Sequence, residues 1–193
     1  MGKDTKSIIL TGVGGQGTIL ASKLLSLGLV KAGYDVKMSE IHGMSQRGGD
    51  VSSHVRYGKK VYSPVVEKGG ADLLVAFEEM EAMRCLPYLK PEGKAVINKY
   101  NINPMPVVTG AVDYPTGLSE EIGQKVQATV VDAAAKAVAL GNAKVMNVIL
   151  LGSTVEMMGL DEVDWAQIIK ENVKAQFVDL NIKAFEEGRK LVR

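Results

Sequence analysis

Cysteine is almost missing from this sequence: Cys85 is the single one among 193 residues. One cysteine excludes an internal disulfide, and it excludes a four-cysteine iron–sulfur cluster or zinc site held by this chain alone. Aromatic residues are also scarce, at 5%, and histidine occurs only twice. No apolar run approaches the roughly 20 residues of a membrane-spanning helix. These absences predict a cytoplasmic protein that is not inserted in a membrane.

An excess of one charge sign is missing as well. The chain has 23 lysines and arginines against 22 acidic residues, and its formal net charge is +1. No general electrostatic attraction to nucleic acid or to a membrane surface is therefore expected. Apolar residues make up 46% of the chain, which is enough for an ordinary core. The length predicts one domain, 1–193.

The start of the chain predicts a strand, a helix and a second strand. Residues 7–13 form a short apolar run rich in β-branched residues that stops at glycine, which is typical of a buried parallel strand. Residues 16–32 repeat apolar residues at helical spacing. Residues 35–41 predict the second strand. Together these segments predict a Rossmann-like βαβ unit.

The rest of the chain continues the alternation of strands and helices, with one interruption. Two short strands at 51–58 and 59–64, joined at Gly58 and Lys59, predict a small hairpin insertion. An excursion with a short edge strand is expected at 101–110. Strands are predicted at 71–78 and 91–99, and a strand followed by a helix at 127–140. Helices are predicted at 78–89, 143–159, 161–173 and 175–192. This order predicts a three-layer α/β/α fold with a mostly parallel sheet.

The loop GVGGQG joins the first predicted strand to the first predicted helix. Gly12, Gly14 and Gly17 match the G-x-G-x-x-G pattern, in which glycine permits positive φ and a close approach of the backbone to a phosphate. The helix that follows offers unpaired amides to an anion. Glu40, at the end of the second strand, is a candidate ribose ligand in a dinucleotide site. Three alternatives remain open: a nucleotide, another anion, or glycines that serve packing alone.

A second glycine-rich loop lies within HGMSQRGGDVSSH, residues 42–54. It follows the second predicted strand, so we expect it at the same carboxyl edge of the sheet as GVGGQG, where ligands of open α/β sheets bind. Arg47 would bind a carboxylate or phosphate, and Ser45 and Gln46 offer hydrogen bonds. The alternative is a structural turn with a solvated arginine.

Other chemical sites have little support in the sequence. His42 and His54 lack a supporting cluster at metal-ligand spacing, so no metal site is predicted. Cys85 falls inside a predicted helix and is expected to be a packing residue. The apolar face from Val145 to Met158 predicts either a subunit contact or a buried core helix.

Taken together, the two loops resemble those of a known family, the gamma-type subunits or domains of the 2-oxoacid:ferredoxin oxidoreductases. The similarity is greatest to the beta subunit of the indolepyruvate branch, and it covers nearly the whole chain. It is carried by IILTGVGGQGTILASKLL, SQRGGDVSSHVR, DLLVAFE and NVILLGS. The pairing of GVGGQG with SQRGG about 28 residues later is more specific than either motif alone.

The resemblance implies a subunit that works only inside a larger complex. In that family a partner subunit carries thiamine diphosphate and iron–sulfur clusters. The complex oxidatively decarboxylates a 2-oxo acid, reduces ferredoxin and delivers the acyl group to coenzyme A. The indolepyruvate branch implies aryl pyruvates as substrates. No cofactor is expected on this chain, which would be inactive in isolation.

The resemblance also implies that the two loops face the partner's active site and bind coenzyme A phosphates or the substrate. No catalytic residue is predicted, because neither loop carries an obvious general acid or base. A free-standing NAD(P)-dependent dehydrogenase and a scaffold without ligand remain the alternatives. The predicted binding residues are Gly12, Gly14, Gly15, Gln16, Gly17, Ser45, Gln46, Arg47, Gly48 and Gly49.

Overall fold

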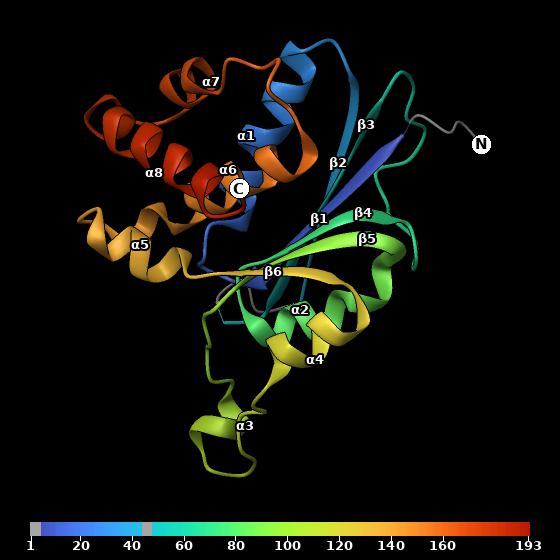
Figure 1. The fold of residues 1–193 in the computed structure, drawn as a ribbon, viewed down its shortest axis with the longest axis vertical. Coiled ribbons are helices and arrows are strands. Elements are labelled where there is room, and N and C mark those ends of the chain that lie inside the picture. The colour runs from blue at the N-terminus through green and yellow to red at the C-terminus, as the bar shows by residue number, and fades with distance from the viewer. Residues whose placement is uncertain (1–4, 44–47) are drawn as a thin grey trace.

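The computed structural model describes residues 5–43 and 48–193, which form a six-stranded sheet with helices on both faces (Figure 1). The strands are β1 (Lys6–Val13), β2 (Asp35–His42), β3 (Asp50–Gly58), β4 (Ala71–Ala76), β5 (Leu89–Asn98) and β6 (Gln127–Val131). The helices are α1 (Thr18–Lys31), α2 (Glu79–Cys85), α3 (Met105–Val108), α4 (Leu118–Lys125), α5 (Ala133–Ala139), α6 (Met146–Met158), α7 (Trp165–Asn172) and α8 (Val178–Lys190). Short 3₁₀ turns are η1 (Leu86–Tyr88), η2 (Ala143–Val145) and η3 (Ala175–Phe177).

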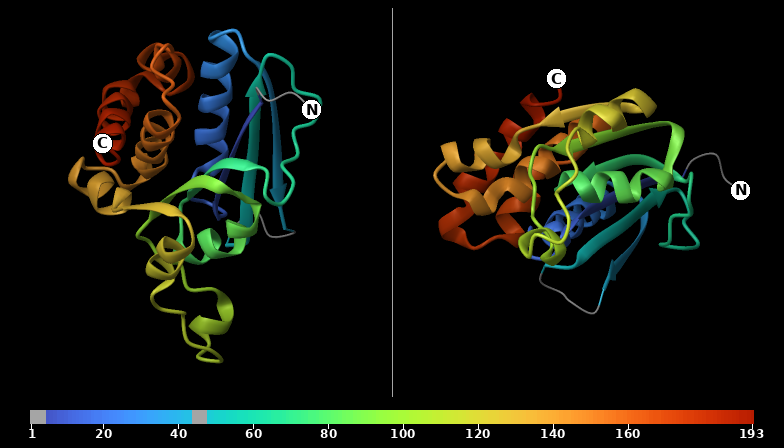
Figure 2. Two further views of the ribbon diagram at one scale, coloured as in Figure 1. Left: turned by 45° about the vertical axis from the view of Figure 1, so that its right-hand side comes forward. Right: turned by 90° about the horizontal axis from the view of Figure 1, so that it is seen from below.

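The sheet has the order β2-β3-β1-β4-β5-β6. Strands β1, β4, β5 and β6 are parallel, whereas β3 runs antiparallel to both of its neighbours, β1 and β2. Helices α1, α5, α6, α7 and α8 lie on one face, and α2 and α4 cover the other (Figures 1 and 2). The predicted three-layer α/β/α fold with a mostly parallel sheet is therefore confirmed.

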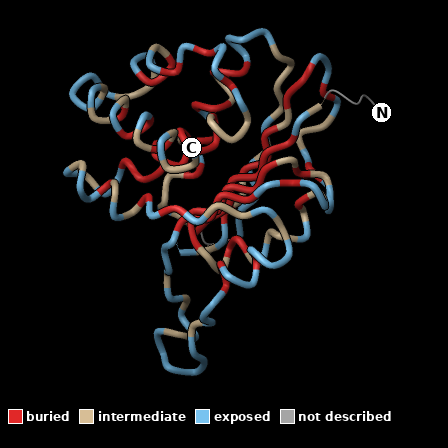
Figure 3. Tube along the Cα trace, viewed as in Figure 1, coloured by how far each residue is buried: buried red, intermediate tan, exposed pale blue. Residues whose placement is uncertain are grey.

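Strand β1 is buried from Ser7 to Val13 because both of its faces are covered. Ile8 and Leu10 pack into the larger core beneath α1 and α6, while Ile9 packs into the smaller core beneath α2 and α4. Figure 3 shows the buried residues concentrated along the central strands. The first strand, first helix and second strand of the sequence prediction are all present.

The pairing of these first elements differs from the predicted Rossmann-like unit. Strand β2 pairs only with β3 among the described residues, and β3 lies between β2 and β1. The predicted hairpin of 51–58 with 59–64 is also wrong, because 59–64 forms no strand. Both edges of β3 are already occupied by β1 and β2, so no edge is left for a further strand. The carboxylate of Asp35 instead fixes this segment by accepting a hydrogen bond from the Val61 amide at 2.9 Å.

Three later elements refine the predictions. The helix predicted at 78–89 ends at Cys85, where Pro87 follows in η1. The predicted edge strand within 101–110 is replaced by α3, which has proline in its first turn. The segment from Met146 to Val155 is buried throughout, so the core-helix alternative for the Val145–Met158 face is the correct one.

Residues 99–117 form an arm, defined here by those bounds, that projects from the body of the molecule with α3 at its tip (Figure 1). Figure 3 shows that most of this arm is exposed. Across the described ranges, 5–43 and 48–193, no helix combines the length and apolar character needed to span a bilayer.

Candidate functional site

The GVGGQG loop turns the chain from the end of β1 into α1. Gly15 and Gly17 have φ of 106° and 84°, values that residues with a side chain rarely adopt. Gly17 is the N-cap of α1, which has no side-chain cap and no acidic residue in its first turn. The positive end of the dipole of this 14-residue helix is therefore not neutralised by a side chain of its first turn, and it faces the loop. This geometry suits an anion, one of the alternatives that the sequence left open.

Both polar atoms of the Gln16 side chain bind within the protein. Its Oε1 accepts from the Val13 amide at 2.7 Å, and its Nε2 donates to the Phe77 carbonyl at 3.0 Å. Gln16 therefore ties the end of β1 to the end of β4 and shapes the loop. A Cβ at Gly12 would lie 2.7 Å from this Oε1 and 2.8 Å from the Cβ of Phe77, so Gly12 is required for packing.

The two glycine-rich loops are in direct contact. The Gly14 amide donates to the Gly49 carbonyl at 2.8 Å, and the Gly48 amide donates to the Gly14 carbonyl at 3.2 Å. The predicted juxtaposition at the carboxyl edge of the sheet is confirmed by these bonds. The predicted ligand residues Ser45, Gln46 and Arg47 lie outside the described residues.

A cavity of about 470 Å³ opens beside the start of α1. Its lining includes Leu20, Asn147, Lys144, Lys174 and Phe177. Asn147 also reaches the glycine loop, where its Nδ2 donates to the Gly17 carbonyl at 3.4 Å. The loop thus continues into a cavity that combines amide, ammonium and apolar groups.

The helix α2 brings a buried carboxyl to the same edge of the sheet, which the sequence analysis missed. Burial raises the pKa of Glu81 to about 6, opposed by the Arg84 guanidinium and reinforced by Glu78 and Asp50. The ion pair of Glu81 with Arg84 measures 3.2 Å. Its only sequence signal is position, on the first turn of the helix that follows a buried strand.

Cys85 lies on the face of α2 that packs against β1. Its Sγ donates to the Thr11 hydroxyl at 3.2 Å, and burial raises the pKa of the thiol. A raised pKa keeps the sulfur protonated at neutral pH, so it is a poor nucleophile. The contact agrees with the predicted packing role.

The two histidines lie on different strands. His54 is buried in β3, where its ring nitrogen accepts from the Val66 amide at 3.1 Å, and burial lowers its pKa. His42 lies exposed at the end of the edge strand β2. Within residues 5–43 and 48–193, no group of three or more His, Cys, Asp or Glu is arranged to hold a metal ion.

Glu40, the candidate ribose ligand, lies exposed on β2. Because β3 separates β2 from β1, Glu40 is two strand spacings, about 10 Å, from the strand that carries the glycine loop. In a dinucleotide-binding βαβ unit the corresponding strand is adjacent. This arrangement disfavours the NAD(P) alternative.

Comparison with known proteins supplies the family. The family described as pyruvate ferredoxin/flavodoxin oxidoreductase matches residues 7–191. The chain is 38% identical to indolepyruvate oxidoreductase subunit IorB of Thermococcus kodakarensis, over 97% of this chain and 96% of that protein. It is 36% identical to the subunit of the same name from Archaeoglobus fulgidus, over 94% and 92% of the two chains.

Solved structures share the fold at lower identity. The gamma subunit of a keto/oxoacid ferredoxin oxidoreductase from Geobacter sulfurreducens has a TM-score of 0.71 and 23% identity, over 97% of this chain and 98% of that one. The 2-oxoglutarate:ferredoxin oxidoreductase from Magnetococcus marinus, solved with coenzyme A bound, has a TM-score of 0.77 and 19% identity. There the match covers 99% of this chain and 31% of the longer polypeptide. Because the family match spans nearly the whole sequence and the curated relatives exceed 30% identity over nearly their full lengths, the chain belongs to the pyruvate ferredoxin/flavodoxin oxidoreductase family.

Proposed function

We propose that this chain is the small subunit of an indolepyruvate:ferredoxin oxidoreductase. The complex oxidatively decarboxylates an aryl pyruvate to its coenzyme A thioester and passes two electrons to ferredoxin. The observation that carries the proposal is the nearly full-length similarity to subunits named IorB, at 38% identity. The contact between the two glycine loops also supports it, because the two motifs that carry the resemblance meet there in the fold.

The redox groups of such a complex do not fit this chain. Its single cysteine is half-buried against Thr11 and cannot supply the thiolates of a cluster. We therefore place thiamine diphosphate and the iron–sulfur clusters on a larger partner subunit. This chain would bind and orient the co-substrate at the interface.

The glycine loop is the proposed contact for a phosphate group of coenzyme A. The uncapped start of α1 offers backbone amides, and no carboxylate in its first turn opposes an anion. A Cβ built at Gly15 meets no atom within 4 Å, so this residue borders open space. The adjacent cavity of about 470 Å³, with Lys144 and Lys174, would take a further part of the ligand.

The arm, residues 99–117, is the proposed contact with the larger subunit. Met105, Val108 and Val112 are 69%, 63% and 56% exposed, although all three are apolar. The arm leaves the body at the end of β5, the same carboxyl edge that carries the glycine loops. A subunit seated on the arm would therefore face the proposed coenzyme A site.

Replacing Gly15 with alanine tests the binding site in the assembled complex. The change adds one methyl group toward the open space where the phosphate would approach. We expect Gly15→Ala to raise the KM for coenzyme A about tenfold or more, since a charge-assisted hydrogen bond contributes about 1.5–3 kcal/mol. Aryl pyruvate-dependent reduction of ferredoxin by the co-purified complex is the measurement.

Gly33→Ala is the matched control, because Gly33 has φ of 91° and also meets no atom within 4 Å, but lies beyond the opposite end of α1. Both variants should lose a similar amount of stability, about 1–2 kcal/mol. An equal KM in the two variants would reject the coenzyme A site. Failure of the chain to co-purify with any larger iron–sulfur protein from anaerobic cells would reject the subunit assignment itself.

A further inference from the structure

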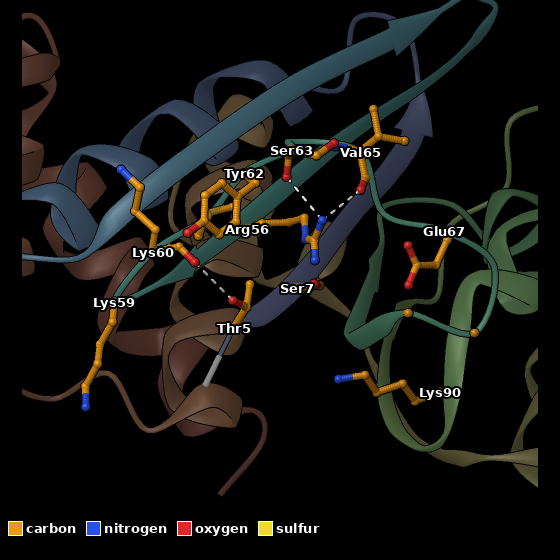
Figure 4. Close-up of a pocket in the computed structure, with 13 residues that line it drawn as sticks. Thr5, Ser7, Arg56, Lys59, Lys60, Tyr62, Ser63, Val65, Glu67 and Lys90 are labelled. Atoms are coloured by element: carbon orange, nitrogen blue, oxygen red, sulfur yellow. Dashed lines mark hydrogen bonds between the residues drawn. The ribbon is translucent and has the colours of Figure 1, made fainter. Parts of the chain in front are cut away.

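A second cavity, of about 730 Å³, lies at the opposite edge of the sheet (Figure 4). It is formed by the start of β1, the end of β3 and the segment 59–70. Strand β1 has eight residues and the glycine loop follows its other end, so the two sites are separated by about 23 Å. This cavity is therefore distinct from the proposed coenzyme A site.

Arg56 is held in this cavity with donor capacity to spare. Its Nη1 donates to the carbonyl oxygens of Ser63 and Val65, each at 3.2 Å, which fixes the guanidinium. Its Nε is buried and has no hydrogen-bond partner among the described residues. Because Nε itself is buried, a ligand in the cavity would meet the outer nitrogens of the guanidinium instead. Figure 4 shows the guanidinium lying within the hollow.

Positive charge exceeds negative charge around the cavity. Its basic lining residues are Arg56, Lys59, Lys60 and Lys90, whereas Glu67 is the single carboxylate among the described lining residues. Lys90 pairs with Asp72 at 2.8 Å, but Lys6 shares the same oxygen at 3.3 Å. One carboxylate thus serves two ammonium groups and leaves part of their charge uncompensated.

We propose that this cavity binds a small phosphate ester, with its phosphate between Arg56, Lys90 and the Ser7 hydroxyl. A tetrahedral phosphate presents several acceptor oxygens, which matches donors that approach from different elements. Ser7 lines the cavity from β1, Arg56 from β3 and Lys90 from β5. Tyr62, 89% exposed, offers its ring to the organic part of the ligand. The concave shape and the volume, within the usual range for small-molecule sites, favour this ligand over a protein surface.

Phenyl phosphate is a suitable probe, and its binding to the isotopically labelled chain can be followed by NMR. We expect amide shifts at Ser7, Gly69 and Gly70 that saturate together. Benzoate, which has a planar carboxylate in place of the phosphate, should bind about tenfold more weakly. Shifts confined to the glycine loop of residues 12–17 would overturn the proposal.

Charge-removing variants of the full chain provide the second test. Arg56→Gln and Lys90→Gln should each weaken phenyl phosphate binding about tenfold or more. Lys23→Gln, an exposed cation on α1 outside the cavity lining, should leave binding unchanged. If Arg56→Gln fails to fold, Lys90→Gln carries the test alone, since the Lys90 side chain is only partly buried. Unchanged affinity in Lys90→Gln overturns the proposal. The proposal is also overturned if the chain binds no phenyl phosphate and the variants of the cavity no longer co-purify with the larger subunit. The cavity would then be a protein interface.

Discussion

Glu81 makes the stability of this protein depend on pH in an unusual direction for a carboxyl. Its pKa is raised from 4.5 to about 6 by burial. Between these values the folded protein binds more protons than the unfolded chain, so the free energy of unfolding falls as the pH rises. The side chain is 7% exposed, and the loss is roughly 2 kcal/mol at most.

The Glu81→Gln variant isolates this effect, because the amide keeps the size of the side chain and does not ionise. We expect the variant to gain stability relative to the wild type as the pH rises from 4 to 7, with little difference at pH 4. Chemical denaturation of both proteins across this range measures the difference. A constant difference, or one that grows toward acid, would show that burial does not govern this carboxyl.

At the residue scale, the sequence predicts glycine positions better than side-chain roles. The glycines of GVGGQG lie in the predicted turn, and the positive φ that Gly15 and Gly17 adopt there is a local requirement. The structural role of Gln16 was not predicted, because its amide donates to the carbonyl of Phe77, 61 residues away. Glu81 went unnoticed for the same reason. Its pKa is raised by burial in the folded protein, and this burial cannot be seen in the sequence.

At the scale of elements, α6 and α8 pack so closely that glycine is required on both. A Cβ at Gly188 would lie 1.8 Å from the Ile149 carbonyl oxygen, and one at Gly152 would lie 2.0 Å from that of Phe185. Neither distance can be relieved without moving a backbone. The close approach also lets the Ser153 hydroxyl of α6 donate to the Gly188 carbonyl at 2.8 Å.

This packing reverses the usual effect of a helical glycine-to-alanine change. Gly188→Ala should destabilise the protein by about 3 kcal/mol or more, because the added methyl forces the helices apart. Gly123→Ala in α4 is the control, since a Cβ there meets nothing within 4 Å. It should stabilise by about 0.5–1 kcal/mol. Thermal unfolding of the two variants decides the matter, and the same sign for both would refute the packing argument.

The sequence predicted most elements but not the pairing of the first strands. Periodicity and glycine punctuation are local signals, so β1, α1, β2, β4 and α6 fall close to their expected ranges. The insertion of β3 between β2 and β1 depends on which sheet edge is free when the chain returns. The pairing therefore depends on all the strands of the sheet, and residues 51–64 alone do not predict it.

At the scale of the whole molecule, the same buried carboxylate anchors both ends of the arm of residues 99–117 to the body. Glu78, two residues beyond β4, is fully buried and accepts from the Ile102 amide at 3.2 Å and from the Tyr114 hydroxyl. It also caps α2 by accepting from the Glu81 amide at 2.9 Å. The entry and the exit of the arm are thus tied to the same side chain. Such an anchor gives an exposed segment a defined direction in the absence of packing along its length.

An anchored arm with exposed apolar side chains suits insertion into the proposed larger subunit. The double variant Met105→Asp, Val108→Asp should keep its thermal midpoint, because both side chains are largely exposed in the free chain. Burial of two such side chains contributes about 3 kcal/mol, so assembly should weaken by about 100-fold. Val138→Asp on α5 is the control, since Val138 is 65% exposed and lies outside the arm. Co-purification of each variant with the larger subunit is the measurement. Equal recovery of the two variants would mean that the partner seats elsewhere, and the proposed orientation of the coenzyme A site toward that partner would fail with it.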